Sequence, residues 1–157
     1  MDRIAIGKKM NEIRSYQNHG ERSRPVIRDI LRQSRLRPTR QRMALAELLF
    51  AKGTRHVSAE GLYDEAMSSD VPVSLATIYN TLHQFTEAGL LREVAVDGSK
   101  AYFDTNVSNH HHFLIEEDSE VIDIPDGQIT VGSIPETPSG YEITRVDVVV
   151  RLRRLDR

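Results

Sequence analysis

The 157-residue sequence contains no cysteine, which limits the chemistry open to it. Disulfide bonds, thiolate zinc sites and cysteine nucleophiles are excluded, so histidine and carboxylate side chains would have to hold any metal ion. Long apolar runs are missing as well: none approaches the roughly 20 residues that span a bilayer, and the N-terminus lacks the apolar core of a secretory signal. We therefore expect no membrane partner and a cytoplasmic location.

The net charge of −2 hides an uneven distribution of charge along the chain. Residues 1–50 hold 12 Lys or Arg against 5 Asp or Glu, whereas residues 113–142 hold eight acids and no Lys or Arg. A basic front and an acidic back are typical of a nucleic-acid-binding head joined to a module with another task. On charge alone, a solvated basic helix face explains the front equally well.

Apolar residues recur at helical spacing in four segments that follow one another from Pro25 to Gly89. Pro25 suits the first turn of the first helix. Thr39, Ser58 and Ser74 are placed to cap the next three, and Gly89 is suited to end the last of them. The pattern predicts a short, compact run of helices.

Two β-prone segments, 91–96 and 100–103, flank Asp97-Gly98, a pair typical of a tight hairpin. Helices followed by a hairpin predict a winged helix, in which the third and fourth helices form a helix-turn-helix. The fourth helix is expected to pack through Leu75, Ile78, Leu82 and Phe85. Its outward residues, which could read bases in a major groove, are then Ala76, Thr77, Tyr79, Asn80 and His83.

Beyond His112 the sequence becomes β-prone at residues 113–115, 121–124 and 141–152. The last segment alternates apolar and polar residues from Ile143 to Val150, which predicts a long strand with one buried face. Such a tail is too small to fold alone, so we expect a homodimer. The predicted fold is α+β: an N-terminal extension (1–24), a winged-helix DNA-binding domain (25–107) and a small α/β dimerisation and sensor domain (108–157).

The run His110-His111-His112 is the most distinctive chemical feature of the sequence. Successive residues of an extended chain point to opposite sides, so His110 and His112 can share one site while His111 faces another. Taken alone, three histidines in an exposed loop need not bind anything.

Five short motifs resemble, in their order and spacing, those of the ferric uptake regulator (Fur) family. They are LRPTRQR (36–42), HVSAEGLY (56–63), ATIYNTL (76–82), YFD (102–104) and HHHFLI (110–115). The likeness covers residues 25 to about 125. It implies a transcription regulator, not an enzyme, which binds double-stranded promoter DNA as a homodimer or a higher oligomer.

The resemblance places Tyr79 and Asn80, with Thr77 on the same face, where relatives touch DNA. Many relatives have Arg at the position of Asn80. Asn bonds adenine with two hydrogen bonds whereas Arg prefers guanine, so this departure predicts an A-richer target. Arg37 matches a basic residue that relatives lay in the minor groove. The alternative is that Tyr79 is a packing residue and Asn80 a solvated one.

The resemblance also implies a regulatory metal site made by His56, Asp104 and His111. The family's last ligand corresponds to Phe113, so the site is one ligand short or borrows a neighbouring histidine. Imidazole with carboxylate suits iron(II), manganese(II) or zinc, and the ligand types do not choose among them.

Other metal sites of the family are missing from this sequence. Residues 116–119 stand where the first CxxC pair of a structural zinc site would lie, and Thr130 and Val146 stand near the ligands of a second site. Three histidines without cysteines resemble the iron response regulator branch, whose members bind haem through this cluster. Neutral imidazole is a sound axial ligand, so His110, His111 and His112 are candidate haem ligands. That branch implies binding to pseudo-palindromic iron-control elements in the control of iron and haem genes.

Three alternatives stay open. Asp104 in place of the commoner Glu resembles peroxide-sensing relatives, which makes a peroxide- or manganese-sensing regulator the nearest alternative. A metalloenzyme built on His56, Asp104 and the histidine run belongs to another class, but the sequence offers no general base or nucleophile beyond those ligands. A winged helix that binds only proteins is the third, and salt-dependent binding to a DNA duplex would distinguish it.

Overall fold

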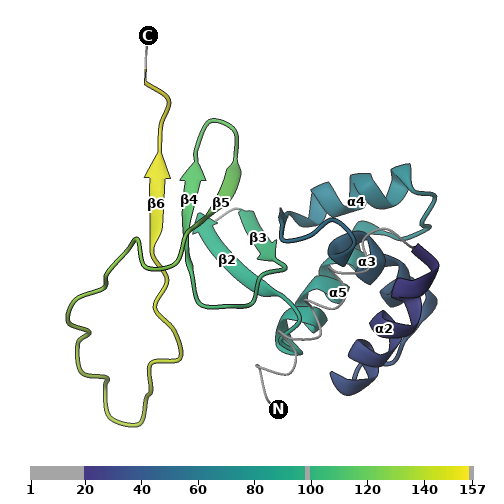
Figure 1. The fold of residues 1–157 in the computed structure, drawn as a ribbon, viewed down its shortest axis with the longest axis horizontal. Coiled ribbons are helices and arrows are strands. Elements are labelled where there is room, and N and C mark those ends of the chain that lie inside the picture. The colour runs from purple at the N-terminus through teal and green to yellow at the C-terminus, as the bar shows by residue number, and fades with distance from the viewer. Residues whose placement is uncertain (1–19, 98–99, 156–157) are drawn as a thin grey trace. The chain divides into compact units, whose positions relative to one another are not determined.

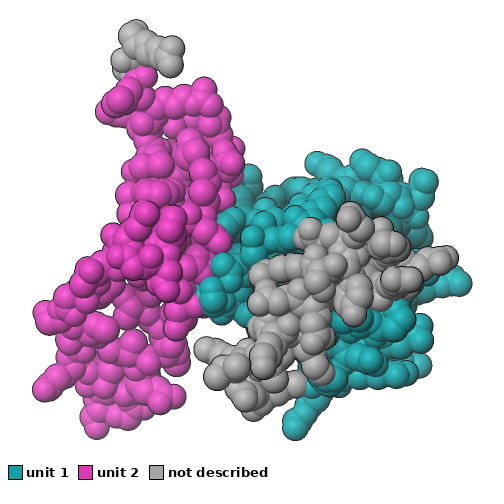
Figure 2. Space-filling view, in the orientation of Figure 1, with its two compact units in different colours: residues 1–108 teal, residues 109–157 magenta. Residues whose placement is uncertain are grey.

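The computed structural model describes residues 20–97 and 100–155 and divides into two compact units, residues 1–108 and 109–157 (Figure 2). The first unit contains α2 (Gly20–Gln33), α3 (Arg40–Phe50), β1 (His56–Val57), α4 (Ala59–Ser68), α5 (Leu75–Glu87), β2 (Arg92–Asp97) and β3 (Lys100–Asp104). The second contains β4 (His111–Ile115), β5 (Glu120–Ile124) and β6 (Val149–Leu152) (Figure 1). Within the described ranges, no helix is long and apolar enough to cross a bilayer.

The three predicted helix caps are confirmed. The hydroxyls of Thr39, Ser58 and Ser74 each accept a hydrogen bond from the backbone N–H three residues later, at 3.3, 3.1 and 3.1 Å. Each cap satisfies a donor that would otherwise lack a partner in the first turn, so these residues fix where α3, α4 and α5 begin. Gly89 follows α5 with a φ of 74°, the left-handed conformation that ends helices.

The helix α2 begins at Gly20, five residues before the start predicted at Pro25. Proline has no N–H, so at the sixth helical position it leaves one carbonyl of the first turn without its usual donor. A proline is therefore compatible with this helix because it lies close to the N-terminal end. Of the N-terminal extension predicted over residues 1–24, residues 20–24 form the start of α2, and residues 1–19 lie outside the described residues.

The inner faces of the four helices form the core of the first unit together with the hairpin of β2 and β3, which we call the wing. Its largest fully buried side chains include Leu31, Leu49, Leu62, Leu82 and Phe103. Burying an aliphatic side chain of this size contributes about 1.5–3 kcal/mol, so this cluster positions α5 firmly against α3 and α4. Leu75, predicted to face inward, is 37% exposed because it is the first residue of α5 and lies at the margin of the core.

A three-stranded antiparallel sheet in the order β1-β3-β2 completes the first unit. The strands β2 and β3 form the predicted hairpin, whose tip at residues 98–99 lies outside the described ranges. The strand β1 was not predicted, because two residues are too few to show a period. It pairs His56 with Asp104 and Val57 with Phe103, and so brings two distant parts of the sequence together.

The second unit is a sheet in the order β5-β4-β6, with β4 antiparallel to β5 and parallel to β6. No helix occurs in residues 109–155, although the tail was predicted to be α/β. Pro125, Pro135 and Pro138 interrupt the connection from β5 to β6, and a helix interior does not tolerate such prolines.

The long strand predicted over residues 141–152 is wrong in its first two thirds, since only Val149–Leu152 is a strand. Among the described residues, no strand pairs with residues 141–147, and β4 reaches this segment only at Val148, whose carbonyl accepts from the N–H of His112. Ile143, expected on a buried face, is 46% exposed.

Ion pairs fasten the end of β6 to the turn between β4 and β5. Arg151 donates to Glu116 at 3.0 Å, and Arg154 donates to Asp118 at 2.7 Å. The backbone N–H of Arg154 also bonds a carboxylate oxygen of Glu117 at 3.1 Å. The resemblance places the family's first cysteine pair in this acidic turn. In this chain, exposed ion pairs join the turn to the end of β6.

Candidate functional site

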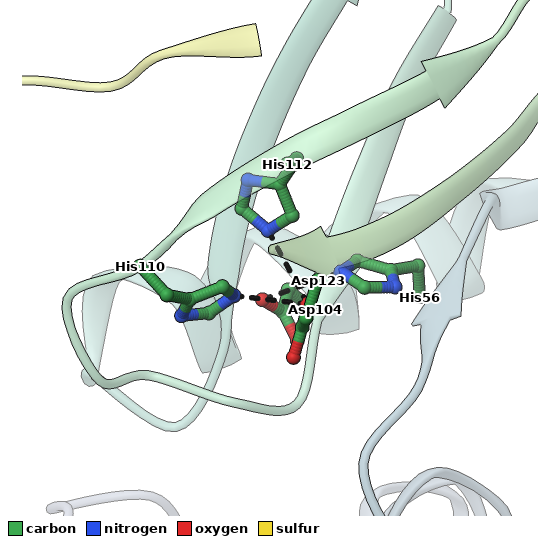
Figure 3. A group of neighbouring side chains, drawn as sticks. All are labelled: His56, Asp104, His110, His112 and Asp123. Atoms are coloured by element: carbon green, nitrogen blue, oxygen red, sulfur yellow. Dashed lines mark ion pairs between the residues drawn. The ribbon is translucent and has the colours of Figure 1, made fainter. Parts of the chain in front are cut away.

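His56 and Asp104 form a histidine-carboxylate set within the first unit (Figure 3). They are direct partners on antiparallel strands, so their side chains share one face of the sheet. Nε2 of His56 lies 3.5 Å from Oδ2 of Asp104, whose side chain is fully buried. The other oxygen, Oδ1, accepts a hydrogen bond from the backbone N–H of Asn106 at 2.7 Å, which orients the carboxylate.

Arg92 is the partner of Asp104 on the other neighbouring strand, β2. It is only 4% exposed, and its Nη1 donates to the backbone carbonyl of Ser108 at 2.8 Å. His56, Asp104 and Arg92 thus occupy one row across the three strands. The carboxylate of Asp104 therefore has on one side an imidazole that can bind a metal and on the other a guanidinium that is charged whether or not a metal is bound.

His110, His112 and Asp123 form a second set, which belongs to the other unit (Figure 3). Oδ1 of Asp123 lies 3.0 Å from Nε2 of His110 and 3.6 Å from Nε2 of His112. The centroids of the two imidazole rings are 4.5 Å apart. Both rings therefore present the same nitrogen to one carboxylate oxygen, which is how side chains converge on a cation.

His111 faces away from this second set, as the two-residue period of a strand requires. Its Nδ1 accepts a hydrogen bond from the backbone N–H of Val148 at 3.2 Å. A neutral imidazole that accepts at Nδ1 carries its proton on Nε2, so neither nitrogen is left with a lone pair for a metal. The structure brings together His110 and His112 but not His111, which the resemblance had placed in the metal site.

Asp123 was not considered from the sequence, although a pattern for finding it was present. The β-prone segments 113–115 and 121–124 flank the acidic turn at residues 116–119. Pairing them as a hairpin sets Ile115 opposite Glu120 and, three residues further along, His112 opposite Asp123. The register of a hairpin therefore indicates the carboxylate that accompanies the histidines.

Each set offers imidazole and carboxylate groups as potential metal ligands. Zinc, iron(II) and manganese(II) all accept this combination of nitrogen and oxygen donors. The first unit supplies two of the donors and the second unit three. Zinc takes four ligands in most of its protein sites, so neither set completes such a coordination shell alone.

The outward face of α5 carries the residues predicted to contact DNA. Tyr79 and Asn80 are exposed on it, as expected, and Thr77 is half-buried near its N-terminus. The hydroxyl of Thr77 lies 2.9 Å from that of the cap residue Ser74. Thr77 therefore takes part in the N-terminal cap of α5. Its side chain lies in the first turn of that helix.

Tyr79 is held by a residue that the sequence analysis did not single out. Its hydroxyl donates a hydrogen bond to Oε1 of Glu60 on α4 at 2.6 Å. The hydrogen bond from Tyr79 lowers the pKa of the Glu60 carboxyl, and the same bond raises the pKa of the Tyr79 hydroxyl. Across the neutral range, Glu60 is thus ionised and Tyr79 keeps its proton.

Arg37 is exposed in the loop between α2 and α3. Its backbone carbonyl accepts a hydrogen bond from Nη1 of Arg42 at 3.0 Å. Arg42 also bonds the side chain of Gln84 on α5. The loop that carries Arg37 and the helix that carries Tyr79 are consequently connected through a single guanidinium.

A helix-turn-helix with a wing, followed by a separate β unit and supplied with histidine-carboxylate sets, defines a winged-helix protein of the metal-responsive regulator class. The family profile for the ferric uptake regulator family matches residues 33–151. The chain is 37% identical over 116 residues to the peroxide-responsive repressor PerR of Staphylococcus aureus, which covers 73% of this chain and 77% of that protein. The chain belongs to the ferric uptake regulator family.

Solved structures agree with this assignment. The ferric uptake regulator of Pseudomonas aeruginosa with manganese is similar with a TM-score of 0.62 at 26% identity, covering 83% of this chain and 99% of that one. The ferric uptake regulator of Vibrio cholerae has a TM-score of 0.63 at 21% identity, covering 81% and 98%, which supports the fold alone.

Members of this family are metal-responsive transcription regulators that bind DNA as dimers, and they are not enzymes. The predicted family and the α+β fold class are therefore confirmed, and the metalloenzyme alternative is set aside. The relatives just named are ferric uptake regulators and a peroxide-responsive repressor, so the iron response regulator branch stays a prediction.

Proposed function

We propose that this protein regulates transcription by binding promoter DNA with an affinity set by divalent metal bound at its two histidine-carboxylate sets. The ligands are His56 and Asp104 from the first unit and His110, His112 and Asp123 from the second. The observation that carries the proposal is the division of donors, two in one unit and three in the other. Metal bound at these sets adds positive charge beside the carboxylates of Asp104 and Asp123.

Metal binding by the first set is supported by the row of side chains across the three strands, which consists of His56, Asp104 and Arg92. Asp104 is oriented by the N–H of Asn106, and Arg92 is bonded to Ser108, the last residue of the first unit. These contacts pre-organise the carboxylate before a metal arrives, which reduces the ordering that binding requires. They also connect the site to the segment that leads into the second unit.

DNA is read, in this proposal, by Tyr79, Asn80 and Thr77 of α5 in the major groove, with Arg37 reaching the backbone or the minor groove. The exposure of Tyr79 and Asn80 on the second helix of a helix-turn-helix supports this assignment. In a dimer the two helices would address half-sites about 34–36 Å apart on a pseudo-palindrome.

Fluorescence anisotropy on genomic promoter fragments, with manganese(II), zinc or anaerobic iron(II), tests the metal response. The wild-type protein is expected to change its Kd for DNA at least about tenfold, a coupling of about 1.4 kcal/mol that is ordinary for allosteric proteins. Asp123→Asn and His56→Ala should abolish the change, whereas His111→Ala, the matched control, should keep it. A response that survives Asp123→Asn and is lost in His111→Ala would contradict the ligand set.

A response to peroxide is the first of two more specific functions that we propose, and a relative of this chain supports it. The Staphylococcus aureus relative is a peroxide-responsive repressor. Asp104 in place of the commoner Glu also resembles peroxide-sensing members of the family. Iron(II) held by imidazoles would expose these rings to oxidation by peroxide. Mass spectrometry after treatment with iron(II) and peroxide should then show an added oxygen on one of the ligand histidines, and not on His111.

A haem response is the second finer candidate, in the control of iron and haem genes at iron-control elements. His110 and His112 are neighbouring imidazoles with ring centroids 4.5 Å apart, and imidazole is a good axial ligand of haem iron, so these two rings are the candidate ligands. Titration with haem, followed by absorption spectroscopy, tests whether the protein binds haem. Footprinting on genomic DNA with and without haem identifies the DNA site and shows whether haem strengthens or weakens binding to it. Equal haem spectra from wild type and a His110→Ala/His112→Ala variant would exclude these ligands.

A further inference from the structure

The side chain of Tyr79 is fixed by contacts on two sides. Its hydroxyl donates to Oε1 of Glu60 at 2.6 Å, and its ring stacks on His83, four residues later on α5, with centroids 6.5 Å apart and an interplanar angle of 23°. Glu60 itself lies in the first turn of α4, whose start is fixed by the cap Ser58. The direction of the Tyr79 hydroxyl is therefore set by the fold and not by the ligand.

A phenol has a single proton to donate. Once Glu60 has accepted that proton, the Tyr79 oxygen retains only lone pairs, so toward any other partner it acts purely as an acceptor. In the major groove adenine and cytosine present an exocyclic amino group, whereas guanine and thymine present a carbonyl at the corresponding position. An acceptor can bond the first pair of bases and is repelled by the second.

We propose that Glu60 is a specificity-determining residue: by occupying the proton of Tyr79, it makes this tyrosine select the amino-bearing bases adenine or cytosine over guanine or thymine. The inference rests on the proposed function, in which Tyr79 touches DNA. It goes further because it assigns the base preference to an acidic residue on the other helix of the helix-turn-helix.

The surroundings of Glu60 keep it ionised, which keeps the hydrogen bond in this direction. The carboxylate lies at the N-terminal end of α4, where the helix dipole stabilises negative charge. The positive charge of Lys100, at the start of β3 in the wing, acts on it in the same sense. The hydrogen bond from Tyr79 lowers the pKa of the Glu60 carboxyl, so Glu60 remains ionised at neutral pH.

A carboxylate beside a DNA-binding face also repels phosphates whatever the base sequence. Neutralising Glu60 therefore has two separable consequences, a general rise in affinity and a change in base preference. Asp64 provides the matched control, because it is an exposed acid one turn further along the same helix. Removing its charge changes the general affinity and leaves Tyr79 untouched.

The experiment compares wild type with Tyr79→Phe, Tyr79→Ala, Glu60→Gln and Asp64→Asn on a pool of random duplexes. Kd measurements on the selected site with each base at each position follow. Tyr79→Phe is expected to weaken discrimination at one position in each half-site by roughly threefold to tenfold, the value of one net hydrogen bond. The amide of Gln can donate to the phenol oxygen and free its proton. Glu60→Gln should consequently shift preference at that same position toward guanine or thymine.

Two results separate failure of this inference from failure of the proposed function. If Tyr79→Phe alters the preference while Glu60→Gln behaves like Asp64→Asn and changes only general affinity, Glu60 does not determine specificity and the DNA contact stands. If Tyr79→Phe and Tyr79→Ala both retain wild-type affinity and preference, Tyr79 is not in the interface, and both ideas fail at this residue. Thermal unfolding of each variant checks that all are folded alike.

Discussion

Arg42 on α3 donates two hydrogen bonds to the side-chain oxygen of Gln84 on α5, from Nε at 3.2 Å and from Nη2 at 2.7 Å. The third nitrogen of the same guanidinium bonds the backbone carbonyl of Arg37. The planar fork of arginine makes these three bonds possible at once, which an ammonium group does not allow. The relative placement of Arg37 and the α5 face therefore depends on Arg42.

Arg42→Lys keeps the charge and removes the fork, so we expect weaker DNA binding without a change in net charge. A loss of about 1 kcal/mol, the net value of one hydrogen bond, corresponds to roughly fivefold in Kd. Gln84→Ala should have a similar effect. Fluorescence anisotropy over a series of salt concentrations measures both variants.

The salt series also tests Arg37 separately. If Arg37 neutralises a phosphate, Arg37→Ala should lower the slope of log affinity against log salt by about one, whereas Gln84→Ala should leave the slope unchanged. Parallel slopes for Arg37→Ala and wild type would show that Arg37 does not contact the DNA backbone.

Glu65 on α4 stabilises the first unit through its contacts with Arg55 and Lys52. Both guanidinium Nη atoms of Arg55 donate to its carboxylate, one of them at 3.0 Å, and Lys52 approaches to 3.1 Å. The hydrogen bond from Arg55, followed by that from Lys52, lowers the pKa of the Glu65 carboxyl. We expect Glu65→Gln to lower the free energy of unfolding by about 2 kcal/mol, in the range of hydrogen bonds to charged groups.

The pH dependence of this difference has a definite sign. Because the folded pKa of Glu65 lies below its unfolded value, the stabilisation is fully present above the unfolded pKa and is lost as pH falls through the folded pKa. Denaturant unfolding from pH 7 to pH 3 should show a constant gap between wild type and Glu65→Gln near neutrality, which closes in acid. Lys52→Gln, at a more exposed partner, should show a smaller gap, and a gap that widens in acid would contradict the assignment.

Asp104→Asn tests the first histidine-carboxylate set while keeping the shape of the side chain. Asparagine retains an oxygen that can accept from the N–H of Asn106, so the turn after β3 is preserved while the negative charge is removed. An ion at a concentration of 100 times its Kd stabilises a protein by about 2.7 kcal/mol. We expect zinc or manganese(II) to raise the Tm of wild type and not that of Asp104→Asn; an equal rise in both would remove Asp104 from the ligands.

Local features of this protein were predictable from its sequence, because they depend on neighbouring residues. The caps at Thr39, Ser58 and Ser74 and the outward face of α5 follow from short-range hydrogen bonding and helical period. The separation of His111 from His110 and His112 follows from the period of a strand. None of these needed knowledge of the tertiary structure.

Features that depend on long-range pairing were missed or misjudged. The strand β1 exists only because β3 lies beside it, and Asp123 joins the histidines only through the hairpin register. The interaction of Tyr79 with Glu60 links residues 19 apart on two helices, which no periodicity reveals. The predicted strand over residues 141–148 failed for the opposite reason, since no strand among the described residues pairs with residues 141–147.

The exposed alternation at residues 141–148 predicts where two copies of the chain meet. Ile143 is 46% exposed and Tyr141 is 75% exposed, although family members bind DNA as dimers and such side chains gain from burial. Burying one isoleucine contributes about 1.5–3 kcal/mol, and a two-fold axis makes each substitution count twice. Ile143→Glu is therefore expected to raise the dimer dissociation constant by roughly a hundredfold or more, as measured by sedimentation equilibrium. Thr144→Glu adds the same charge at the neighbouring polar residue and should leave the dimer nearly intact, so equal dissociation of the two variants would place the interface elsewhere.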